Sequence, residues 1–172
     1  MNEMRLHRQS LGLLLMLIVQ FVLGMVLDLF VELPKNHAGT SGDFISRAWH
    51  GFIWAVSSGG GIVLTLHVIV AIGLILGSIG LVIRAAILRN RFWLAISIVG
   101  ALGIFVALTN GLAFIGYGND VNSFVMAMGF IVAAVAYSPA LSVAENPFKS
   151  RGASRTRSSR PMVSRKYRPR HT

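Results

Sequence analysis

The chain has 172 residues, of which 54% are apolar and 13% are charged, and this composition is too apolar for an ordinary soluble domain. It contains no cysteine, which excludes disulfides, thiolate metal sites and a cysteine nucleophile. Its formal charge is +10, and most of the basic residues lie outside four long apolar stretches. No Walker-type loop, zinc-protease motif or nucleophile elbow is found.

The first apolar stretch, residues 11–33, follows Arg5, His7 and Arg8, so it must be weighed against a cleaved secretory signal. The run is longer than the core of a signal peptide, and no small-residue cleavage site follows it. We therefore predict a retained helix that crosses the bilayer.

The next segment predicts a short amphipathic helix outside the spans. From Asp43 onward, apolar residues that include Phe44, Trp49 and Ile53 recur at helical spacing, and Asp43 is a candidate cap for the first turn. We expect this helix to lie in the outer membrane interface, anchored by Trp49 and Trp54.

Three further apolar stretches cover residues 61–83, 93–115 and 123–143. Each has about the twenty residues that a helix needs to cross roughly 30 Å of hydrocarbon, and lipid offers no partner for unpaired backbone groups. The fold class is therefore an all-α membrane protein with an antiparallel bundle of four spans in residues 1–145. Small residues at helical spacing predict close helix contacts at Gly73, Gly77, Gly80, Gly103, Ala107 and Gly111.

The basic residues predict the orientation. Arg5 and Arg8 precede the first span, three arginines join the second and third, and nine lysines or arginines follow the fourth, whereas only Lys35 and Arg47 lie on the other side. This bias places both termini in the cytoplasm and the protein in the cytoplasmic membrane. The tail, residues 146–172, is rich in arginine and serine, and we expect it to be disordered and to contact anionic lipid rather than nucleic acid.

A layer of polar residues is predicted beneath the outer surface. In the first span Gln20, Gly24 and Asp28 follow one another at steps of four, and counting inward from the span ends places Asp28, His67 and Asn110 at a similar depth. Ionisable groups in a bilayer are costly unless they are paired, so these residues are candidates for a functional site. An Asp28 to His67 contact is one expectation, and snorkelling of Asp28 to outside water is the other.

The pattern Gln20-Phe-Val-Leu-Gly24, followed by His67-Val-Ile-Val-Ala71 on the next span, resembles one four-helix half of the haem A synthase family. The resemblance covers the first two spans, and it implies that His67 occupies the position of a haem ligand. The family takes a second histidine from the fourth span, where this chain has none, and Met126 or Met128 is the candidate replacement.

Three functions remain open at this point. The first is a non-enzymatic membrane subunit or scaffold that contacts other subunits, or a second copy of itself, through its glycine faces. The second is a haem or quinone module for electron transfer that uses His67, Met126 and Gln20. The third is a small proton or solute transport element that uses Asp28 and His67.

Overall fold

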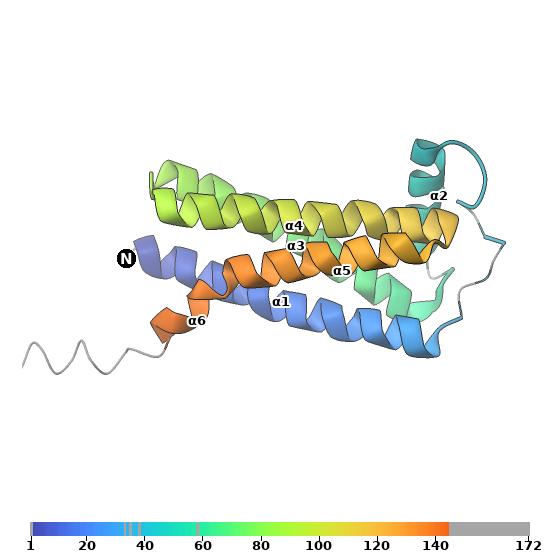
Figure 1. Ribbon diagram of the computed structural model, residues 1–172, viewed down its shortest axis with the longest axis horizontal. Coiled ribbons are helices and arrows are strands. Elements are labelled where there is room, and N and C mark those ends of the chain that lie inside the picture. Colours follow the sequence, from blue (N-terminus) through green and yellow to red (C-terminus); the bar gives the residue numbers. More distant parts are fainter. Residues whose placement is uncertain (1, 33, 35, 38, 58, 145–172) are drawn as a thin grey trace, which may run out of the picture.

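The structure is a computed structural model that describes residues 2–32, 34, 36–37, 39–57 and 59–144. These residues form six helices, and α1 (Asn2–Phe30), α3 (Gly61–Ile87), α4 (Arg91–Tyr117) and α5 (Asp120–Tyr137) lie alongside one another (Figure 1). The two shorter helices are α2 (Phe44–Val56) and α6 (Pro139–Ala144). The predicted disordered tail, residues 146–172, lies outside the described residues.

Four helices are long and apolar enough to cross a membrane, as the sequence predicted. Their apolar segments are Met4–Phe30, Gly61–Ile87, Arg91–Tyr117 and Asp120–Leu141. The largest difference from the prediction concerns the first helix, which begins at Asn2 and ends at Phe30 instead of covering residues 11–33. Its early end is consistent with Pro34, because proline lacks the amide hydrogen that a continuing helix needs.

Helices α1 and α3 pack through the predicted glycine face of α3. The Leu13 side chain lies over Gly77, and the Met16 side chain lies over Gly73. A Cβ atom at either glycine would lie 2.8 Å from the side chain above it. Residue numbers rise along α1 as they fall along α3 in these contacts, so the two helices run in opposite directions.

Helices α4 and α5 approach even more closely. A Cβ atom at Gly103 would lie 2.6 Å from the Gly129 carbonyl oxygen, and one at Gly129 would meet the Gly103 oxygen at the same distance. This confirms the predicted small-residue face of the third span, and its partner is the backbone of α5. Two residues, Gly118 and Asn119, connect the helices, and Gly118 has the positive φ of 62° that glycine tolerates.

The predicted amphipathic helix is present as α2, which lies across one end of the bundle (Figure 1). It contacts α3 and α4 and buries Gly51 and Ala55. The expectation that Asp43 caps the helix is wrong for its side chain, which makes no hydrogen bond to the first turn although Asp43 holds the cap position. Phe44, Trp49 and Ile53 are exposed, whereas Phe52 and Trp54, the second expected interface anchor, pack on a buried cluster that includes Leu64 of α3.

We call the end that carries α2 and the described residues just before it the loop end. The opposite end carries the first turns of α1 and the turn between α3 and α4, and we call it the arginine end (Figure 1). Its described arginines are Arg5, Arg8, Arg84, Arg89 and Arg91.

Candidate functional site

The polar centre of the bundle is a contact between Gln20 of α1 and His67 of α3. The Gln20 side-chain nitrogen lies 2.9 Å from Nε2 of His67, a hydrogen-bonding distance. Gly24, one turn along α1, packs beside the ring, since a Cβ atom there would be in van der Waals contact with Cε1 of His67 at 3.4 Å. The structure thus brings Gln20, Gly24 and His67 together, and the contact with His67 is made by Gln20 instead of the expected Asp28.

Each of the two side chains keeps one buried polar atom without a partner among the described residues. These atoms are Oε1 of Gln20 and Nδ1 of His67. Either Gln20 donates to Nε2, or its amide is turned and Nε2–H donates to Oε1, and both arrangements leave one atom of each residue unpaired. A buried unpaired polar group costs about 1–3 kcal/mol, so this site is not a fully satisfied network.

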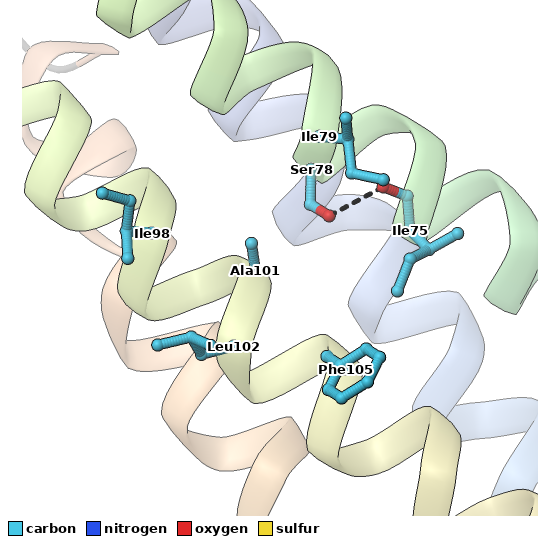
Figure 2. Close-up of a pocket in the computed structure, with 7 residues that line it drawn as sticks. All are labelled: Ile75, Ser78, Ile79, Ile98, Ala101, Leu102 and Phe105. Atoms are coloured by element: carbon cyan, nitrogen blue, oxygen red, sulfur yellow. Dashed lines mark hydrogen bonds between the residues drawn. The ribbon is translucent and has the colours of Figure 1, made fainter.

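Asn110 lies close to the depth of His67 without completing that network. Residues of α3 and α4 that include Ser78 and Ala101 line one groove (Figure 2). Because Ser78 and Ala101 line the same groove, they lie at a similar depth. At 1.5 Å per residue, His67 is about 16 Å from Ser78 along α3 and Asn110 is about 14 Å from Ala101 along α4, so His67 and Asn110 also lie at similar depths. The Asn110 amide donates to the Val106 carbonyl oxygen of its own helix at 2.9 Å.

Met126 is the other predicted ligand, and its sulfur packs on α4. A Cβ atom at Gly111 would lie 3.3 Å from the Met126 sulfur, which places Met126 at the level of Gly111 and thus near that of Asn110. The bundle therefore gathers Gln20, His67, Asn110 and Met126 within about one helical turn of depth, and only Gln20 is hydrogen-bonded to His67.

Asp28 differs most from its predicted place. The expected depth was counted from a span that ended at residue 33, but α1 ends at Phe30, so Asp28 is exposed in the last turn of the helix. It lies about 12 Å from Gln20 along α1. A proton relay through Asp28 and His67 would therefore lack a direct contact between the two side chains.

A second polar group, at the arginine end, was not predicted. The Gln9 side chain donates to the Gly77 carbonyl oxygen at 3.0 Å and accepts a hydrogen bond of 2.9 Å from the Arg84 guanidinium. Gln9 precedes Leu13 and Met16 on the face of α1 that meets α3. Its signal was in the sequence, because Gln9 precedes Gln20 by eleven residues, or about three helical turns, and so lies on the same face of α1, but the predicted span began at residue 11.

Two open cavities lie among the described residues at different levels of the bundle. One, of about 260 Å³, is an apolar groove between α3 and α4, where the Ser78 hydroxyl donates to the Ile75 carbonyl oxygen (Figure 2). The other, of about 460 Å³, lies at the arginine end and is lined by Arg5, Leu6, Arg84, Ile87 and Leu88. His67 lines neither of them, and no group of three or more potential metal ligands was found in the described part of the chain.

Comparisons with protein-family models, with curated proteins and with solved structures found no match to this chain. The resemblance to the haem A synthase family thus rests only on residues 20–24 and 67–71.

Proposed function

We propose that this multi-pass membrane protein is a non-enzymatic membrane subunit, an antiparallel bundle of four spans in which polar side chains hold the helices in register. In this proposal both termini are cytoplasmic, and the exposed apolar face of α2 lies in the outer interface, where Trp49 reaches the lipid headgroups. The glycine faces are occupied inside the bundle. A partner subunit would therefore meet the outward aliphatic side chains.

The observation that carries the proposal is the position of His67. Its ring is packed on Gly24 and within hydrogen-bonding distance of Gln20, and it lines neither cavity. A histidine used in this way links α1 to α3, as polar side chains do between membrane helices. The same two helices are tied again at Gln9, about 16 Å along α1 from Gln20.

A double-mutant cycle tests the structural role of the contact. Gln20→Leu and His67→Phe should each lower the free energy of unfolding in detergent by about 1–2 kcal/mol, since each leaves a buried polar group alone. The double variant should lose less than the sum, because it removes both groups together. Unfolding can be followed by tryptophan fluorescence during titration with a denaturing detergent.

Asn110→Leu is the matched control, because the Asn110 amide bonds to its own helix at a similar depth. Its effect should add to that of Gln20→Leu without coupling. Strict additivity of Gln20→Leu and His67→Phe would overturn the proposed tie between α1 and α3.

A haem module is the second candidate, favoured by the unpaired Nδ1 of His67 and by Met126 at a similar depth. The arrangement does not fit a haem as it stands, because Nε2 of His67 is within hydrogen-bonding distance of Gln20 and Nδ1 is buried. An absorption spectrum of protein purified from haem-replete cells decides between the two. A Soret band that His67→Ala abolishes and Asn110→Leu retains would establish the haem module and reject the purely structural role.

A further inference from the structure

The cavity at the arginine end combines two cations with apolar walls. Arg5 comes from α1 and Arg84 from α3, and Leu6, Ile87 and Leu88 complete the lining. Leu6 is buried and forms the inner wall, whereas Ile87 is 74% exposed at the outer rim. The volume of about 460 Å³ is within the range of roughly 300–1,000 Å³ that is usual for small-molecule sites.

Arg84 is held in place by a neutral partner. Its guanidinium donates to Oε1 of Gln9, and Gln9 is fixed in turn by its bond to the Gly77 carbonyl oxygen. This interaction uses one of the five N–H donors of arginine and neutralises none of its charge. The acidic residues with described side chains are all found at the loop end, at Asp28, Glu32, Asp43 and Asp120.

An apolar track leads away from the cavity along the outer face of α3. Ile87, Ile83 and Ile79 are exposed by 74%, 52% and 49%, and Leu76 continues the same face at 64%. Their spacing of three and four residues places them on one side of the helix. A molecule that fits both features would have an anionic head at the arginines and a hydrocarbon chain along α3.

We infer that this cavity is a binding site for one anionic phospholipid, with the phosphate at Arg5 and Arg84 and an acyl chain along Ile87, Ile83 and Ile79. Arginine suits this role because its planar donors match phosphate oxygens and its charge is permanent. Basic pockets between spans are known to take lipid headgroups. The site lies outside the Gln20 and His67 contact, so it does not depend on the function proposed above.

Lipid titration of the delipidated full-length protein, followed by native mass spectrometry, tests the site. Phosphatidylglycerol should bind saturably with one tight site, and phosphatidylcholine and soluble glycerol phosphate should bind at least tenfold more weakly. Arg5→Gln and Arg84→Gln should each weaken phosphatidylglycerol binding about fivefold. Arg91→Gln is the control, because it removes an equal charge at the arginine end from a residue that does not line the cavity.

The outcomes separate the sources of binding. A loss with Arg91→Gln as large as that with Arg84→Gln would show attraction to the charged surface only, and would overturn the site. Equal binding of phosphatidylcholine would remove the requirement for an anionic head. Glycerol phosphate that binds as tightly as the lipid would assign the cavity to a soluble phosphate compound. If Arg84→Gln fails to fold, Arg5→Gln still tests the site, because among the described residues Arg84, and not Arg5, makes the hydrogen bond that joins α1 to α3 at this cavity.

Discussion

Tyr137 shows at the scale of one residue how tightly the interior is packed. Its side chain is completely buried and lies on Gly100 of α4, where a Cβ atom would be 2.6 Å from the tyrosine hydroxyl oxygen and closer still to the ring. Gly100→Ala should lower the free energy of unfolding by about 1–3 kcal/mol, the usual cost of overpacking. This loss should appear although alanine favours helix over glycine by about 1 kcal/mol.

Gly12→Ala is the control, because a Cβ atom at Gly12 would meet nothing within 4 Å. It should leave stability unchanged or raise it, since it brings only the gain in helix propensity. Thermal unfolding of both variants in the same detergent makes the comparison. Equal stability of the two would mean that the Tyr137 ring can move away from Gly100.

Polar and small residues inside the spans could be identified from the sequence, because a polar side chain in hydrocarbon must face another helix. This reasoning found Gln20 and His67. It did not find their pairing, since the depth of Asp28 depended on a helix end that the sequence placed three residues too late. Tyr137 gave no signal at all, because a tyrosine near the end of a span is equally compatible with the membrane interface.

Arg47 joins helix α2 to the end of α4. Its Nε donates to the Gly42 carbonyl oxygen at 2.8 Å and a terminal nitrogen donates to that of Gly116 at 3.2 Å. The guanidinium carbon also lies 4.6 Å from the centre of the Tyr117 ring. One planar group thus makes three contacts, and two of them reach the end of α4.

Arg47→Lys should therefore loosen α2 although it keeps the charge, because an ammonium group cannot make these contacts together. Hydrogen exchange measured by mass spectrometry should become about tenfold faster for the amides of residues 44–56, with α1 and α5 unchanged. Arg91→Lys, at the other end of the molecule, should change neither region. Unaltered exchange in α2 would show that the burial of Gly51 and Ala55 is sufficient to hold it.

The amphipathic period correctly predicted the existence of α2 but not which side of it packs. The bundle contacts Gly51, Phe52, Trp54 and Ala55, while Phe44, Trp49 and Ile53 remain exposed. In a soluble protein the large apolar side would face the core. At a membrane, lipid accepts such side chains as well as protein does, so the hydrophobic pattern alone cannot choose the packed side.

For the whole molecule, hydropathy was sufficient to find the four spans, because the backbone in lipid has no alternative to the helix. The pairing of the helices could not be read from the sequence, since glycines of α3 meet single side chains of α1, and glycines of α4 meet both the backbone and side chains of α5. The two ends of the resulting bundle differ in charge. Five described arginines lie at the arginine end, and Arg47 is the described cation of the loop end.

This asymmetry predicts how the protein is inserted, and the absence of cysteine makes the prediction easy to test. Met4→Cys and Ser41→Cys each place one thiol at an exposed position, the first at the arginine end and the second at the loop end. Because basic residues are retained on the cytoplasmic side, a membrane-impermeant maleimide added to intact cells should label the Ser41→Cys variant and leave the Met4→Cys variant unlabelled until the membrane is opened. Labelling of the Met4→Cys variant in intact cells would reverse the orientation, and it would also place the proposed lipid site in the outer leaflet.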